Sequence, residues 1–155
     1  MKIVGIRDED FTNYKKSSMY IGFPHCSFKC GHNLCQNSTL AKQVPVEISC
    51  ESLVKRYTCN SFTDAIVIAG LEPMDDYDDL LQFIIEVRKY CTDDIVIYTG
   101  YNKDEILGKV NEIKCSGKVN IIIKFGRFIP DQKPHYDTVL GINLASDNQY
   151  AERIC

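Results

Sequence analysis

The chain has 155 residues, of which 45% are hydrophobic, 25% are charged and 10% are aromatic, values that predict one globular domain over residues 1–155. The net charge of −3 argues against a nucleic-acid-binding protein, which needs a basic surface. No apolar run approaches the roughly 20 residues that a membrane span requires. The first ten residues, MKIVGIRDED, become acidic too early for a signal peptide, so we expect a cytoplasmic protein without a membrane partner.

The first half of the chain predicts short strands around a cysteine-rich loop. Apolar runs with β character lie at residues 2–6 (KIVGI) and 18–23 (SMYIGF), and the loop follows the second run. Residues 47–58 then predict a short helix. Residues 65–70 (AIVIAG) form a continuous apolar run that is rich in β-branched residues and ends in glycine, which is typical of a strand buried on both faces.

The second half of the chain continues the alternation of helices and strands. Its clearest helix is predicted at residues 75–91, where Leu80, Ile84, Val87 and Cys91 repeat at helical spacing. The remaining predicted elements are a strand at 94–100, a polar helix at 102–113, a strand at 119–125 and a short strand at 138–144.

This alternation predicts an α/β fold with parallel strands and right-handed crossover connections. A complete (β/α)₈ barrel needs about 200 residues or more, so we expect a partial (β/α) barrel of about five or six mostly parallel strands. Ligands of such folds bind at the carboxyl ends of the strands. The loops that follow residues 18–23, 65–70 and 94–98 are therefore expected to meet at one site.

The eight cysteines do not indicate a disulfide framework in a chain expected to be cytoplasmic. Cys26, Cys30 and Cys35 lie within ten consecutive residues, so one loop can bring all three to a single metal centre. The other cysteines are scattered and are interpreted as ordinary thiols: Cys50, Cys59, Cys91, Cys115 and Cys155.

The spacing alone leaves three interpretations of the clustered cysteines open. A [4Fe-4S] cluster normally has four thiolate ligands, so three thiolates would leave one iron available to another ligand. A closed structural zinc site would combine the three cysteines with His25 or His32. The third alternative is that the thiols lie together by coincidence.

A second motif, Gly70-Leu71-Glu72-Pro73, ends the buried strand directly before a helix. The glycine lets a ligand approach the backbone closely. Glu72 either sets the geometry of the loop or faces a positive group, and it can also cap the following helix. Four aspartates after it are interpreted as acidic residues that complement the helix dipole: Asp75, Asp76, Asp78 and Asp79.

The two motifs together resemble the radical S-adenosylmethionine (SAM) enzymes, and most closely the small activating proteins of anaerobic ribonucleotide reductase. The resemblance spans about residues 18–150. The shorter matching segments are Cys35-Gln36-Asn37-Ser38-Thr39, Tyr98-Thr99-Gly100-Tyr101, Gly126-Arg127-Phe128 and Ser146-Asp147-Asn148-Gln149.

Three features depart from that family's pattern. Four residues, 31–34, separate the second and third cysteines where the family usually has two. Leu34 stands where an aromatic residue is usual, and Leu71 replaces the second glycine of the strand-end motif. Because Gly31 and Asn33 favour turns, we expect the loop to accommodate its extra length.

The resemblance implies an oxidoreductase with a radical SAM-type partial barrel. Cys26, Cys30 and Cys35 would hold a [4Fe-4S] cluster, and SAM would bind its open iron. An electron from the reduced cluster would cleave SAM into methionine and a 5′-deoxyadenosyl radical, which takes a hydrogen atom from a substrate. The residues that match the SAM site are Leu34, Gln36, Gly70, Leu71 and Glu72, with Gly70 and Leu71 at the amino group and Leu34 and Gln36 beside the adenine.

In the activating proteins the hydrogen atom comes from a glycine of a large glycyl radical enzyme. The resemblance therefore implies anaerobic ribonucleotide reductase as the partner, with flavodoxin or ferredoxin as the electron donor. Two alternatives remain open at this point. One is a radical SAM enzyme that acts on another peptide or small molecule, and the other is a non-catalytic module that binds zinc or an iron–sulfur cluster.

Overall fold

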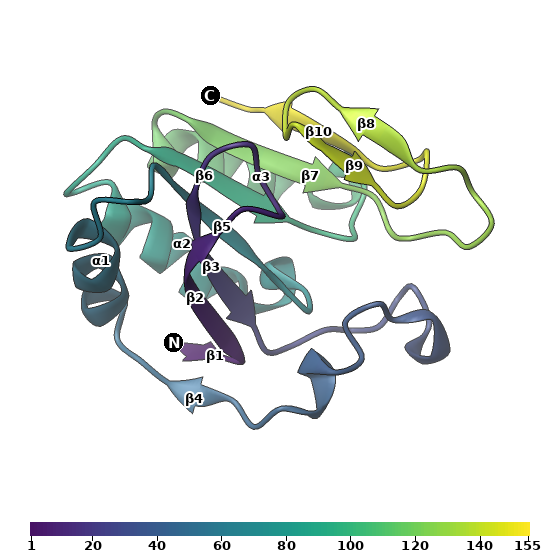
Figure 1. Cartoon of the computed structure of the whole chain (residues 1–155), viewed down its shortest axis with the longest axis horizontal. Helices are drawn as coiled ribbons and strands as arrows, with labels where there is room; N and C mark the ends of the chain where they lie inside the picture. Colours follow the sequence, from purple (N-terminus) through teal and green to yellow (C-terminus); the bar gives the residue numbers. More distant parts are fainter.

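The computed structural model describes all residues from Met1 to Cys155 and has one large mixed sheet of six strands (Figure 1). In the order in which they lie across the sheet, the strands are β10 (Tyr150–Arg153), β7 (Ile121–Phe125), β6 (Asp94–Tyr98), β5 (Ala65–Gly70), β3 (Ser18–Phe23) and β2 (Gly5–Asp10). The four central strands are parallel, whereas β2 and β10 pair antiparallel at the two edges. Because both edges are separate strands, the sheet does not close into a barrel.

Three helices cover one face of this sheet (Figure 1). They are α1 (Cys50–Thr58), α2 (Tyr77–Val87) and α3 (Leu107–Gly117), and short 3-10 helices precede two of them, η3 (Pro73–Asp76) before α2 and η4 (Lys103–Ile106) before α3. Alternate strand residues such as Ile66 and Ile68 point to the helices, because successive side chains of a strand point to opposite faces. None of the helices combines the length and the apolar character that crossing a bilayer demands.

The second face of the sheet has a smaller core that contains no helical residue. Val67 and Val96 of the sheet lie there against Tyr14 of the 11–17 loop. The hairpin of β8 (His135–Asp137) and β9 (Ile142–Leu144) adds Leu144 to the same core. One loop and one hairpin therefore cover the face that the helices leave free.

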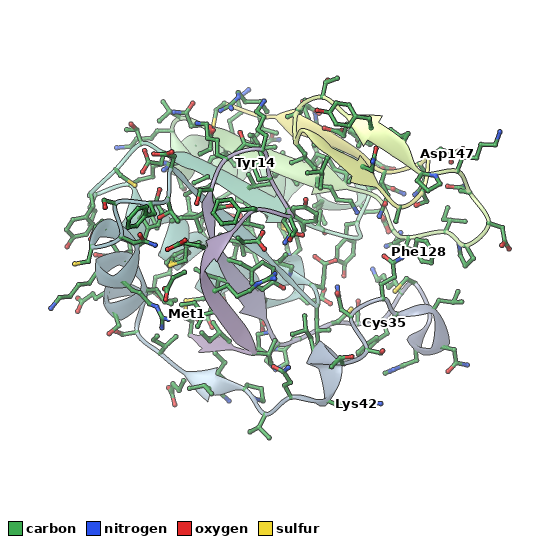
Figure 2. All side chains as sticks on the ribbon, in the orientation of Figure 1. Met1, Tyr14, Cys35, Lys42, Phe128 and Asp147 are labelled. Atoms are coloured by element: carbon green, nitrogen blue, oxygen red, sulfur yellow. The ribbon has the colours of Figure 1, made fainter.

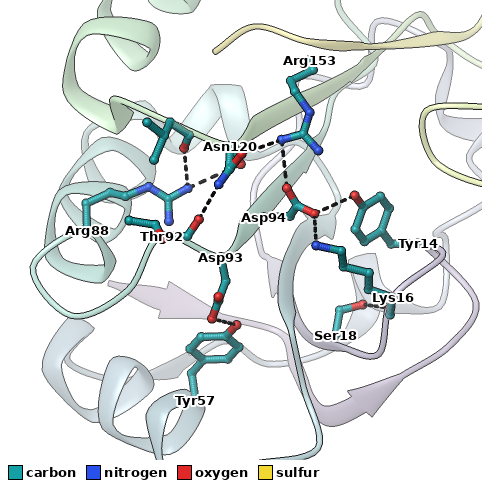
Figure 3. A network of polar contacts seen from close by, with 11 residues as sticks. Tyr14, Lys16, Ser18, Tyr57, Arg88, Thr92, Asp93, Asp94, Asn120 and Arg153 are labelled. Atoms are coloured by element: carbon teal, nitrogen blue, oxygen red, sulfur yellow. Dashed lines mark hydrogen bonds and ion pairs between the residues drawn. The ribbon is translucent and has the colours of Figure 1, made fainter.

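A buried carboxylate joins the 11–17 loop to the sheet, as Figure 3 shows. Asp94, the first residue of β6, accepts hydrogen bonds from the Tyr14 hydroxyl at 2.9 Å and from Arg153 at 2.9 Å, and it forms an ion pair with Lys16 at 2.6 Å. Burial opposes the ionisation of Asp94, but the hydrogen bonds from Lys16, Arg153 and Tyr14 outweigh it and lower the pKa of Asp94. The network fixes the 11–17 loop and β10 to the same end of the sheet.

Most predicted elements are confirmed, with shifted boundaries. The strands at 18–23 and 65–70 have the predicted bounds, and the other two central strands and the helices after β5 and β6 lie where the pattern places them. The single strand expected at residues 2–6 is wrong, because the chain changes partners there: β1 (Lys2–Ile3) pairs with β4 (Val46–Glu47), and β2 pairs with β3.

Two further differences have local causes. The helix expected from residue 47 begins at Cys50, because residues 46–47 are in β4 and the Ser49 side chain accepts the N–H of Ser52 as an N-cap. The tail contains more strand than expected, since β8, β9 and β10 replace the one short strand predicted at 138–144.

Candidate metal and cofactor site

A cavity of about 540 Å³ lies where the loops after β3, β5, β6 and β7 meet. This is the end of the parallel strands at which the sequence places a ligand. All of the predicted site residues line this one cavity: Cys26, Cys30, Leu34, Cys35, Gln36, Gly70, Leu71 and Glu72.

The three candidate ligand thiols are free and half-buried, and they share the cavity without already enclosing a metal position. No three Cys, His, Asp or Glu side chains stand close enough together to hold a metal ion. Burial raises the pKa of the Cys26 thiol to about 11, and the nearby Glu72, Asp75 and Cys30 act in the same direction. Because the thiolate is the metal ligand, a metal that binds Cys26 must displace its proton. The donor set, three thiols that line one cavity, suits an iron–sulfur cluster.

The two histidines of the zinc alternative are engaged elsewhere. The His25 ring contacts the carboxylate of Asp76, and the His32 ring stacks on Phe28 with ring centroids 3.7 Å apart. A zinc site of three cysteines and one histidine would have to break one of these contacts.

The cysteine loop, residues 24–37, is joined to the end of β5 at two points. The carbonyl of His25 accepts the N–H of Glu72 at 2.8 Å. The side-chain amide of Asn37 donates to the carbonyl of Gly70 at 2.7 Å. The strand-end motif at residues 70–73 thus holds both ends of the loop that carries the thiols.

Gly70 is explained by packing against the neighbouring strand. Its φ is +97°, and a Cβ at this position would lie 2.5 Å from the backbone nitrogen of Phe23. Leu71 donates its N–H to the carbonyl of Phe23 at 3.0 Å. It is therefore β3 that approaches the backbone closely here, and the Gly70 carbonyl and the Leu71 amide both have protein partners.

Glu72 sets the geometry of the loops and also caps a helix. The residue is 5% exposed, and its carboxylate accepts hydrogen bonds from the Thr99 hydroxyl at 2.7 Å, the Gly100 N–H at 2.8 Å and the Met74 N–H at 3.1 Å. Burial raises the pKa of Glu72, while these three donors oppose the rise. The carboxylate thus holds the loops after β5 and β6 together, and it caps η3 as expected for a residue directly before a helix.

Lys124 of β7 lines the same cavity, although the sequence motifs do not predict it there. It is 7% exposed, and its ammonium donates to the carbonyl of Gly126 at 2.8 Å. Burial lowers the pKa of Lys124 to about 8, although the negative charge of Glu72 counteracts part of that effect. The one signal in the sequence was a charged residue inside the apolar run of a strand, and its position facing a cavity required the fold.

A known protein family matches the chain over most of its length. A family model described as a 4Fe-4S single cluster domain matches residues 16–149, which include the cysteine loop and all four parallel strands. No curated protein and no solved structure matches the chain. The match agrees with the three thiols that line the cavity at the carboxyl ends of these strands. The chain therefore belongs to the 4Fe-4S single cluster domain family.

Proposed function

We propose that the chain is a radical SAM activating enzyme that generates a glycyl radical on a partner enzyme, anaerobic ribonucleotide reductase. The observation that carries the proposal is that three thiols and the first three residues of the Gly-x-Glu-Pro motif, Gly70, Leu71 and Glu72, line one cavity. Family membership supports the [4Fe-4S] cluster. The motifs that resemble the activating proteins support SAM and the partner, with flavodoxin or ferredoxin as the electron donor.

Cys26, Cys30 and Cys35 would hold the cluster and leave one iron without a protein ligand. When bound, the cluster supplies the electron that cleaves a carbon–sulfur bond of SAM, which yields the radical that removes the hydrogen atom. The protein contributes a cavity with a buried cation, Lys124, which suits the carboxylate of SAM. Glu72 fixes the loops after β5 and β6 relative to each other, because its carboxylate accepts three hydrogen bonds from them.

We propose that the open six-stranded sheet corresponds to an incomplete radical SAM barrel. Helices cover one face of the sheet. The cavity lies on the side of the other face, where it is lined by residues at alternate strand positions: Tyr20, Ala69, Tyr98 and Lys124. In a barrel the corresponding face is the interior. Six strands leave that interior incomplete, which favours a segment of a partner protein as the substrate.

One observation favours a second candidate, an iron–sulfur module without SAM chemistry. The Gly70 carbonyl is bonded to Asn37 and the Leu71 amide to Phe23. These are the backbone groups that the resemblance assigns to the amino group of SAM. In the module, the same cysteine loop would serve electron transfer alone.

The test uses protein reconstituted without oxygen, with iron, sulfide and 5′-deoxyadenosine measured after reduction and addition of SAM. We expect about four irons per chain and formation of 5′-deoxyadenosine. Cys30→Ala should lose the cluster, whereas Cys59→Ala should keep it, because Cys59 is exposed and does not line the cavity. Iron without SAM cleavage would establish the module instead, and bound zinc would exclude both functions.

A further inference from the structure

Tyr101, which directly follows Thr99 and Gly100 at the end of β6, connects several segments around the cavity. Its hydroxyl donates to the carboxylate of Asp75 at 2.6 Å and lies 3.4 Å from the hydroxyl of Ser27. Two cations lie over its ring, Lys29 at 4.5 Å and Arg127 at 5.4 Å from the centroid. One side chain thus contacts the cysteine loop, η3 and the loop after β7.

Asp75 links Tyr101 to the backbone of the cysteine loop by hydrogen bonds. One carboxylate oxygen accepts the Tyr101 hydroxyl, and the other accepts the N–H of Ser27 at 2.6 Å. Hydrogen bonds to a charged group are shorter and stronger than those between neutral groups. Ser27 directly follows Cys26, so Asp75 fixes the backbone beside the first candidate ligand. Asp75 and Asp76, which contacts His25, therefore do more than complement a helix dipole.

Arg127, which lies over the ring of Tyr101, is itself held in place by an ion pair. Its guanidinium donates to both oxygens of Glu105 at 2.8 and 2.9 Å. Two parallel hydrogen bonds of this kind fix the plane of the guanidinium. The backbone is also held, because the carbonyl of Tyr101 accepts the N–H of Gly126 at 3.1 Å.

The remainder of the cysteine loop is joined to the sheet only at its far end, where the Asn37 side chain donates to the Gly70 carbonyl at 2.7 Å. The hydrogen bonds of residues 30–36 stay within residues 28–38, as in the bonds from Gly31 to Phe28 and from Leu34 to Gly31. The loop therefore has a Cys26 half that is anchored along its backbone, and a Cys30–Cys35 half whose own hydrogen bonds are local and which is anchored only at its end, by Asn37.

We propose that Tyr101 is a positioning residue that acts through Asp75 to hold the Cys26 half of the loop against the sheet, while the Cys30–Cys35 half adjusts around the cluster. The inference rests on the proposed cluster site, but the anchoring itself belongs to the metal-free chain. It can therefore be tested before any iron is added.

The first measurement is amide hydrogen exchange of the full metal-free chain. Tyr101→Phe removes the hydroxyl and keeps the ring, and we expect exchange of residues 25–29 to accelerate about tenfold, which corresponds to about 1.4 kcal/mol. The matched control is Tyr77→Phe, since the Tyr77 hydroxyl also binds a carboxylate, that of Glu112 at 2.9 Å, away from the cavity. Equal exchange of residues 25–29 in the two variants would overturn the proposal.

The second measurement separates the hydrogen bond between Ser27 and Asp75 from the negative charge of Asp75. Asp75→Asn keeps an oxygen that can accept the Ser27 N–H, whereas Asp75→Ala keeps none. We expect Asp75→Asn to retain most of the slow exchange of residues 25–29 and Asp75→Ala to lose it. Identical behaviour of the two variants would mean that Asp75 does not anchor the loop through this bond.

The third measurement addresses the cluster. After reconstitution, Tyr101→Phe should lose its iron to a chelator several-fold faster than the wild type and Tyr77→Phe, with an altered spectrum of the reduced cluster. If the wild-type chain takes up no iron, the proposed function fails, while the exchange experiments still decide the anchoring. If the cluster forms and Tyr101→Phe retains it like the wild type, the positioning role fails and the proposed function stands.

Discussion

The carboxylate of Glu72 accepts the Thr99 hydroxyl at 2.7 Å and joins two loops whose residues are 27 positions apart in the sequence. Its second oxygen accepts the N–H of Gly100 at 2.8 Å. One buried side chain thus sets the spacing of the strand ends of β5 and β6, on which the cavity depends.

Glu72→Gln should lower the free energy of unfolding by about 1–3 kcal/mol, because the amide cannot accept all three hydrogen bonds and leaves a buried donor unsatisfied. Urea unfolding followed by circular dichroism measures the change. Glu51→Gln is the control, since Glu51 is an exposed residue in the first turn of α1. A loss below about 0.5 kcal/mol, the usual effect of a surface substitution, would contradict the framework role of Glu72.

Lys124→Met should change how stability depends on pH. The pKa of Lys124 is lowered in the folded chain, from 10.5 to about 8, so the unfolded chain binds more protons between these values. The stability of the wild type relative to Lys124→Met should therefore rise as the pH increases from 8 to 10.5, by about 3 kcal/mol in total. Guanidinium unfolding of both proteins at a series of pH values tests this, and a constant difference would show that the ammonium is not desolvated.

Gly70→Ala should destabilise the chain by about 3 kcal/mol or more, because the new methyl group overlaps the backbone of Phe23 and the positive φ is strained. Gly108→Ala is the matched control. That glycine lies in α3 with open space around it, so alanine should stabilise the chain by about 0.5–1 kcal/mol. Denaturant midpoints of the two variants should move in opposite directions, and a tolerated Gly70→Ala would refute the close approach of β3.

The sequence predicts those strands whose own residues carry the pattern, and it does not predict strands that form because of a distant pairing partner. The strands at 18–23 and 65–70 are evident from their own residues, because a strand buried on both faces is apolar throughout. The sequence YAER of β10 has no such pattern. It is a strand because it pairs with the free edge of β7, and a partner more than twenty residues away leaves no local signal.

In the candidate site, too, local motifs are visible in the sequence, whereas contacts between distant segments are not. The cysteines and the strand-end motif are visible as spacings and lie in one cavity. The link from Tyr101 through Asp75 to Ser27 joins three distant segments by side-chain contacts, which no periodicity encodes. Gly70 was interpreted through a ligand, whereas its nearest neighbour is another strand, and only the register of β3 with β5 reveals this.

Asp94→Asn should destabilise the chain by about 1–2 kcal/mol at neutral pH, because the buried carboxylate loses its charge-assisted hydrogen bonds, while Lys16 and Arg153, whose side chains are 45% and 42% exposed, stay hydrated. The lowered pKa of Asp94 gives stability that is present above the ordinary value of 3.8 and is lost as the pH falls below it. The difference between wild type and variant should therefore shrink in acid. Thermal unfolding at neutral pH and near pH 3 checks this, and a difference that does not change would exclude Asp94 as the titrating group.

The three candidate ligands lie within ten consecutive residues of one loop, outside the sheet and its helices. A cluster on these thiols would cross-link the chain only to its own near neighbours and would bridge no two elements of the core. Assembly of the cluster would then be a local step on a chain that is already folded, and a lost cluster would be rebuilt from iron and sulfide without refolding the protein.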